Sequence, residues 1–159
     1  MIKITVIALA GIKEKYFKEA SAEYEKRLSR YCNLEIIEID PVRLSDKPSD
    51  TEIETALCSE AELIFKKIPK NSKIISMCVE GNTFSSEQLA ETVRKACDFG
   101  SGITFIIGSS YGLSDKVKQK SELKLSFSKM TFPHRLFRIM LLEQIYRAFK
   151  INEGGAYHK

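Results

Sequence analysis

The chain alternates between two kinds of segment, and this alternation limits its possible folds more than any other feature. Short runs rich in Ile, Val and Leu are typical of buried strands, and they occur at residues 2–10, 33–40, 73–79 and 102–107. Between them, apolar residues recur at helical spacing, as in residues 13–31. Strands that alternate with helices predict an α/β fold in which helices flank both faces of a mostly parallel sheet.

Residues at the segment boundaries refine this pattern. Two of the four prolines fall in Pro41–Asp50, which predicts a loop before a helix over residues 53–68. The residues Glu80-Gly81-Asn82 have turn chemistry and predict the end of the third strand. The Ser-x-x-Gln pattern that starts at Ser85 is typical of a capping box and predicts a helix through Cys97.

A fifth strand and a long helix complete the prediction. Leu123, Leu125 and Phe127 alternate as in a strand, and Pro133 suits the first turn of a helix that extends to about Lys150. Apolar residues cover more than one stripe of this helix, although a surface helix needs only one. Either a second copy of the chain covers the extra stripe about a twofold axis, or the helix is deeply buried in its own core.

Composition excludes several classes of protein. A length of 159 residues and a hydrophobic fraction of 43% fit one globular domain over residues 1–159. No apolar run reaches the roughly 18 residues of a membrane span, so we expect no membrane partner. The apolar start of the chain, residues 1–10, is too short for a signal peptide, so we expect a cytoplasmic protein. The four cysteines form no C-x-x-C pair, and we expect them to be reduced and buried. With only two histidines, His134 and His158, and no paired cysteines, we expect no metal site.

The positive charge is concentrated in the second half of the chain. Residues 81–159 carry 12 Lys and Arg against 7 Asp and Glu, whereas residues 1–80 carry 13 against 14. A basic half is typical of a protein with an anionic partner, most often a nucleic acid, although a solvated surface produces the same asymmetry.

Two segments that follow strands are candidates for a binding site. Gly108 and Gly112 flank a loop after the fourth strand, at the edge where open α/β sheets bind ligands, although a turn glycine is the simpler explanation. The segment Leu125–His134 mixes small, polar and aromatic residues that could meet the edge and the ring of a purine. It could equally be an ordinary loop whose Phe residues fill the core.

Basic and aromatic residues near the end of the chain suggest contact with RNA. Guanidinium groups beside aromatic rings suit phosphate binding with base stacking. Arg135 and Arg138 share one face of the last helix, and the chain ends in Tyr157-His158-Lys159. The lysines from Lys116 to Lys124 could extend this surface or could simply be solvated.

Several of these motifs together resemble one known family. Residues 11–16, 107–112, 125–134, 143–148 and 157–159 are similar to the corresponding parts of small bacterial methyltransferases of the SPOUT superfamily, which modify a pseudouridine of large-subunit ribosomal RNA at N3. The similarity covers essentially the whole chain. The run from Ser126 to His134 and the terminal Tyr157-His158 are the specific parts of it.

The resemblance implies a fold, a cofactor and an assembly. The family has a five-stranded, mostly parallel sheet with a C-terminal trefoil knot, acts as a homodimer, and binds S-adenosylmethionine in the knot. Carried over by motif, the residues implied to contact the cofactor are Met77, Gly108, Phe127, Ser128, Lys129, Met130, Thr131 and Phe132. The family often has Leu at position 77 and Gly at position 109, where this chain has Met77 and Ser109. If position 109 required a positive φ, Ser109 would be strained there.

The resulting hypothesis is methyl transfer to N3 of a pseudouridine in ribosomal RNA, either free or in the large subunit or ribosome. His134 and His158 are the candidate bases, and Arg135, Arg138, Tyr157 and Lys159 are expected to position RNA, some of them from a partner subunit. Two alternatives are a knotted methyltransferase that acts on another RNA position, such as a ribose hydroxyl or transfer RNA, and a non-catalytic protein that binds RNA or the ribosome.

Overall fold

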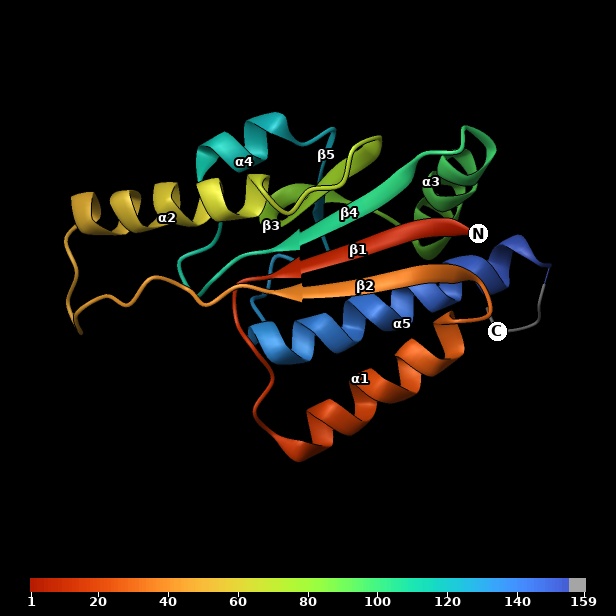
Figure 1. Cartoon of the computed structure of the whole chain (residues 1–159), viewed down its shortest axis with the longest axis horizontal. Helices are drawn as coiled ribbons and strands as arrows, with labels where there is room; N and C mark the ends of the chain where they lie inside the picture. The colour runs from red at the N-terminus through yellow and green to blue at the C-terminus, as the bar shows by residue number, and fades with distance from the viewer. Residues whose placement is uncertain (155–159) are drawn as a thin grey trace.

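Five parallel strands form one sheet in residues 1–154, the part of the chain that the computed structural model describes (Figure 1). The strands are β1 (Ile2–Ala8), β2 (Cys32–Glu38), β3 (Ser72–Thr83), β4 (Gly102–Ile107) and β5 (Leu123–Ser126). The helices are α1 (Lys15–Leu28), α2 (Asp50–Phe65), α3 (Ser86–Asp98), α4 (Asp115–Lys120) and α5 (His134–Asn152). The strand order is β2-β1-β4-β3-β5, which confirms the predicted α/β sheet.

Helices cover both faces of the sheet, as Figure 1 shows for α1 and α5 on one side and α2 and α4 on the other. One apolar cluster joins the sheet to α1, α3 and α5, and a second cluster joins it to α2 and α4. Alternate residues of β1 belong to different clusters: Ile4 and Val6 pack toward α5, whereas Ile7 packs toward α2. Because β1 is buried on both faces, its sequence is a continuous apolar run.

The predicted turn at Glu80-Gly81-Asn82 is wrong, because β3 continues to Thr83. Its pairing with β5 is irregular: Met77 and Asn82 both pair with Leu125, so residues 78–81 bulge out of the ladder. A Cβ on Gly81 would lie 2.7 Å from the backbone carbonyl oxygen of Lys124. The glycine at this position therefore allows two strands to approach closely instead of reversing the chain.

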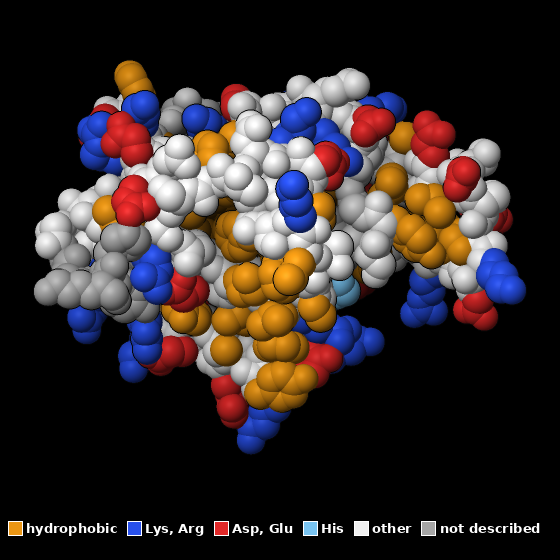
Figure 2. Space-filling view, turned by 180° about the vertical axis from the view of Figure 1, so that it is seen from behind, with side chains coloured by type: hydrophobic (Ala, Val, Ile, Leu, Met, Phe, Trp, Pro, Cys, Tyr) orange, Lys and Arg blue, Asp and Glu red, His pale blue; other side chains and the backbone are white. Residues whose placement is uncertain are grey.

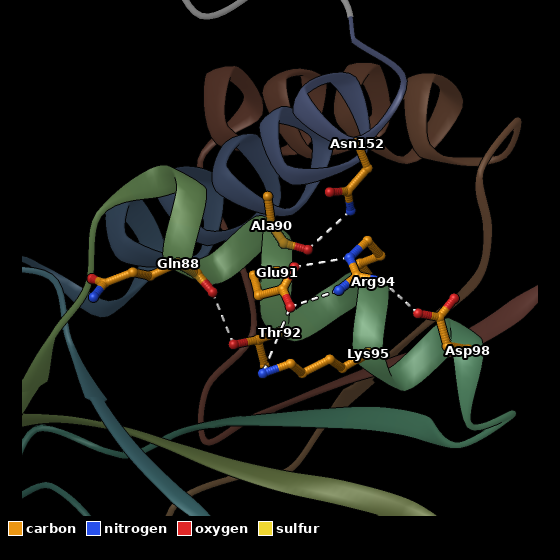
Figure 3. A network of polar contacts seen from close by, with 8 residues as sticks. All are labelled: Gln88, Ala90, Glu91, Thr92, Arg94, Lys95, Asp98 and Asn152. Carbon is orange, nitrogen blue, oxygen red and sulfur yellow. Dashed lines mark hydrogen bonds and ion pairs between the residues drawn. The ribbon is translucent and has the colours of Figure 1, made fainter.

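Helix α5 is held in place along its whole length. Leu141, Leu142 and Ile145 are fully buried against the sheet, and α1 and α3 both contact the helix. At its far end, the Asn152 side-chain amide donates a hydrogen bond of 2.9 Å to the carbonyl oxygen of Ala90 in α3 (Figure 3). Neighbouring helices in its own layer thus cover part of the extra apolar surface that the sequence indicates.

The cysteines differ in exposure, and none forms a disulfide. Cys32 is buried, which raises the pKa of its thiol to about 12 and keeps it protonated. The expectation of burial is wrong for Cys97, which lies on the solvent side of α3 and is exposed. None of the helices in residues 1–154 combines the length and apolar content that crossing a membrane requires.

Candidate functional site

A cavity of about 560 Å³ opens beside the bulge of β3 and the ends of β4 and β5. Three segments form most of its lining, and Lys118 adds to it: the bulge after Met77, the loop that follows Ile107, and the connection from Leu125 to Phe137. They meet because β4, β3 and β5 are parallel neighbours, so their carboxyl ends lie at one edge of the sheet. The volume is within the range of about 300–1,000 Å³ that is usual for small-molecule sites.

The loop after β4 is folded back tightly on itself. The N–H of Gly112 donates a hydrogen bond of 2.9 Å to the carbonyl oxygen of Ser109, and Gly112 has a φ of 86°. A Cβ on Gly108 would lie only 2.4 Å from the carbonyl oxygen of Gly112. Both glycines are therefore required by the shape of this wall of the cavity, Gly112 by its positive φ and Gly108 by close approach.

Ser109 is accommodated without backbone strain. Among the described non-glycine residues only Asn71 has a positive φ, so Ser109 occupies an ordinary conformation. Its hydroxyl donates a hydrogen bond of 3.4 Å to Oε2 of Glu60, a buried residue of α2. The side chain of Ser109 thus has a partner of its own.

The connection between β5 and α5 is ordered by a local serine turn. The hydroxyl of Ser126 donates to the carbonyl oxygen of Ser128 at 2.9 Å, and the hydroxyl of Ser128 accepts from the N–H of Met130 at 3.0 Å. The rings of Phe127 and Phe137 pack with their centroids 4.8 Å apart. This segment therefore supplies the cavity with an aromatic wall and a polar backbone.

His134 begins α5 and lines the same cavity. Burial lowers the pKa of its imidazole, and the positive charges of Arg135 and Arg138 lower it further. The side chain is therefore neutral at pH 7. Its Nε2 atom is buried and has no hydrogen-bond partner within the described residues. A neutral imidazole with one unpartnered nitrogen can accept a proton or a hydrogen bond.

The cavity also has an ionic rim that sequence reasoning missed. Glu80 pairs with Lys118 of α4, and both residues line the cavity. The hydrogen bond from Lys118 lowers the pKa of Glu80, which keeps the carboxylate charged. Glu80 was not predicted as a site residue because the sequence assigned it to a turn. No motif in the sequence links it to Lys118, which lies 38 positions further along the chain.

The structure brings most of the expected cofactor contacts together. The residues among them that line the cavity are Met77, Gly108, Phe127, Ser128, Met130, Thr131 and Phe132. Lys129 is exposed and, unlike Ser128 and Met130, is not part of the lining.

The two arginines expected to position RNA are engaged within the chain. Arg138 is 3% exposed, pairs with Glu38 at the end of β2, and donates to the carbonyl oxygen of Ala10. Arg135 pairs with Glu14 just before α1. These contacts fasten the start of α5 to the loops that follow β1 and β2. Tyr157, His158 and Lys159 lie outside the described residues.

Comparison with known proteins gives full-length matches. Residues 2–158 match the family described as "Predicted SPOUT methyltransferase". The "Ribosomal RNA large subunit methyltransferase H 1" of Clostridium perfringens (strain SM101 / Type A) is 48% identical over 159 residues, covering 99% of this chain and 100% of that protein. The "Putative ribosomal RNA large subunit methyltransferase H" of Methanococcus vannielii is 48% identical with the same coverage.

Proposed function

Because this chain belongs to the SPOUT methyltransferase family, we propose that it transfers a methyl group from S-adenosylmethionine to N3 of a pseudouridine in large-subunit ribosomal RNA. The observation that carries the proposal is that three separate segments, each expected to contact the cofactor, line one cavity at the carboxyl edge of the sheet. We further propose that residues 1–159 act as a single domain and that the enzyme works in the cytoplasm, where its RNA substrate is found.

The residues of the cavity fit a nucleoside with a charged sulfur. Met77, Ile107, Phe127 and Phe132 provide apolar cover for a purine ring. The folded-back loop at Gly108 brings backbone close to the cavity without a side chain in between. The rim carboxylate of Glu80 offers a negative charge near the opening. We therefore assign these segments to binding S-adenosylmethionine.

When bound, S-adenosylmethionine supplies a methyl group that is activated by the positive charge on sulfur. The chain's own residues then have two tasks: to exclude water around the reacting atoms and to remove the proton of the imide N–H. Met77 and Phe127 serve the first, because they are part of the apolar wall. The imidazole of His134 suits the second, since its lowered pKa keeps the ring neutral and its Nε2 has no partner within the described residues.

We propose that the enzyme is a homodimer built on the apolar side of α5. Apolar side chains gather in a strip on the face seen in Figure 2, and exposed residues include Met130 at 69% and Leu136 at 37%. A groove of about 440 Å³ lies beside the cofactor cavity, lined by Tyr24, Phe84 and Met140 among others. A second copy of the same surface is the partner that a twofold interface requires.

The reach of the chain end supports this assembly. Helix α5 has 19 residues, and a helix of that length is about 28 Å long. Glu153 and Gly154 still donate hydrogen bonds to carbonyl groups of α5, so Gly154 stays at the end remote from His134. Four further residues span at most about 14 Å. Because this reach is about half the length of α5, we propose that Tyr157, His158 and Lys159 act at the cavity of the partner subunit.

Contacts with RNA are assigned to basic groups around the opening. Lys129 is exposed between two lining residues, so we propose that it contacts a phosphate and not the cofactor. Arg135 is partly exposed and could exchange Glu14 for a phosphate. Arg138 is buried in its ion pair, which favours a role in holding α5 over direct contact with RNA.

Two measurements test this function. Ribosomal RNA from cells that lack the protein should lose one methyl group at a pseudouridine, as detected by mass mapping of nuclease fragments. A missing methyl on a ribose or in transfer RNA would favour a different substrate for the same fold. Calorimetry with the purified protein should detect S-adenosylmethionine binding, and no binding at physiological cofactor concentration would favour a non-catalytic RNA-binding protein.

A further inference from the structure

A buried carboxylate lies directly behind the glycine loop. Glu60 of α2 is 4% exposed. It lines a second, smaller cavity of about 170 Å³ whose walls are mostly apolar, among them Leu9 and Ala56. This cavity shares Ser109, Ser110 and His134 with the cavity of about 560 Å³ described above, here called the main cavity. The loop after β4 therefore forms the partition between the two cavities.

Glu60 links two loops that are far apart in sequence. Its Oε1 accepts a hydrogen bond of 3.1 Å from the backbone N–H of Val42, in the loop after β2. Its Oε2 accepts a hydrogen bond of 3.4 Å from the hydroxyl of Ser109, in the loop after β4. Both loops leave the carboxyl edge of the sheet, so a single side chain of α2 holds two of the segments that shape this edge.

Such a carboxylate is not what folding alone would favour. Burial raises the pKa of Glu60, which means that the charged form is less stable here than in water. An apolar residue of similar volume would fill the same space without this cost. A costly buried charge that contacts the wall of a binding cavity is expected where it has a role in function.

We propose that Glu60 is a positioning residue: its carboxylate anchors Ser109 to the loop after β2 and so holds Gly108–Gly112 in the shape that binds S-adenosylmethionine. The inference rests on the proposed function of the main cavity. Glu60 itself does not line that cavity, so it acts through Ser109. Without the anchor, the loop would spend less time in the binding shape, and the apparent affinity would fall in proportion.

The test uses four single variants of the full chain and one double variant. E60A removes both hydrogen bonds of the anchor, whereas S109A removes only the one to the glycine loop. E60Q is the conservative variant, since its amide can accept from Val42 and donate to Ser109. E62A is the matched control, because Glu62 is an exposed residue of the same helix. Two quantities are measured: the Kd for S-adenosylmethionine by calorimetry, and the hydrogen exchange of the Gly112 amide in the ligand-free protein.

We expect E60A to raise the Kd by about tenfold and to speed exchange at Gly112 as well, because one opening equilibrium controls both. S109A should have a smaller effect, E60Q should restore most of the affinity, and E62A should behave as wild type. The double variant E60A/S109A should bind no more weakly than E60A alone, since both changes break the same link.

The measurements distinguish failure of the proposed function from failure of the proposed role of Glu60. If the wild type binds no S-adenosylmethionine, both proposals are overturned. If the wild type binds and E60A and S109A bind equally well with unchanged exchange at Gly112, only the role of Glu60 is overturned. The same conclusion holds if E60Q is as weak as E60A, or if the effects of E60A and S109A simply add. S109A keeps the test decisive even if E60A folds poorly, because Ser109 lies in a loop.

Discussion

The carbonyl oxygen of Gly112 lies 2.4 Å from the point that a Cβ on Gly108 would occupy. These two residues are the ends of the loop that forms one wall of the cavity proposed to bind the cofactor, so their contact fixes how closely the loop folds. Real Cβ atoms do not approach backbone oxygen this closely. A side chain at position 108 can be accommodated only if the loop opens.

The first prediction concerns Gly108→Ala. The displaced loop should weaken S-adenosylmethionine binding by about 5- to 150-fold, since overpacking of this kind costs about 1–3 kcal/mol. Isothermal calorimetry measures the effect. The control is Gly11→Ala, whose Cβ would meet only the end of the flexible Glu38 side chain at 3.1 Å. Equal affinity in the Gly108 variant and the wild type would contradict the role of the loop.

The second prediction separates the two arginines of α5. Arg138→Leu should lower the free energy of unfolding by about 1–3 kcal/mol, because the carbonyl oxygen of Ala10 loses its charged donor and Glu38 loses its partner. Arg135→Leu should cost less than about 1 kcal/mol, since its pair with Glu14 is partly exposed. Urea unfolding gives both values.

RNA binding provides the complementary measurement for this pair. Arg135→Leu should weaken binding of a ribosomal RNA fragment more than it weakens the fold, whereas Arg138→Leu should do the reverse. If Arg138→Leu weakened RNA binding more than it weakened the fold, Arg138 would be assigned to the RNA-binding surface.

The sheet was predictable because its evidence is local. Each buried strand is a short β-branched run, and each long helix keeps a 3.6-residue period, so neither depends on distant contacts. The end of β3 was not predictable in this way. Glu80-Gly81-Asn82 has ordinary turn chemistry, and only the approach of Lys124 from β5 explains why Gly81 continues the strand.

The candidate site was predictable only in part. Gly108 and the Leu125–His134 segment follow strands, where a parallel sheet brings loops together, and family motifs mark both. The burial of Arg138 depends on Glu38, 100 positions away, and the anchor at Glu60 on Val42 and Ser109. No local pattern reports such pairings. The sequence alone therefore predicts that Arg138 binds RNA at the surface, whereas in the structure it is a buried residue that pairs with Glu38.

The third prediction concerns the pH dependence of methyl transfer. As a base, His134 must be unprotonated, and its pKa is lowered from 6.5 by burial and by Arg135 and Arg138. Activity should therefore persist below pH 6.5 and fall only as the pH drops through this lowered pKa. The profile of kcat/KM against pH measures the position of this acid limb.

Substitution of His134 is the control for the predicted pH dependence. His134→Gln should reduce methyl transfer by about 100-fold or more and remove the acid limb, while leaving S-adenosylmethionine binding nearly unchanged. An unaltered pH profile in this variant would show that another group accepts the proton.

The fourth prediction concerns the dimer. Met140 lies in the apolar groove beside the cavity, so Met140→Glu should place an unpaired charge in the proposed interface. Light scattering should then show a monomer, with helical content unchanged by circular dichroism. Glu62→Lys, an exposed change on the far side of the sheet, should leave the dimer intact. A wild-type protein that is monomeric at micromolar concentration would contradict the assembly.

The last prediction tests whether the chain end acts on the partner's cavity. One variant lacks residues 155–159 and keeps an intact cavity; the other carries His134→Gln, which should reduce methyl transfer by about 100-fold or more, and keeps its end. Each variant alone should be inactive, because every dimer lacks one component at both sites.

In a mixed dimer, the intact cavity of the first chain meets the intact end of the second chain, which completes one site. An equal mixture after subunit exchange should therefore recover about one quarter of wild-type activity, since half the dimers are mixed and each has one working site. If the end served its own chain, no dimer in the mixture would contain a complete site, and the mixture would stay as inactive as its components.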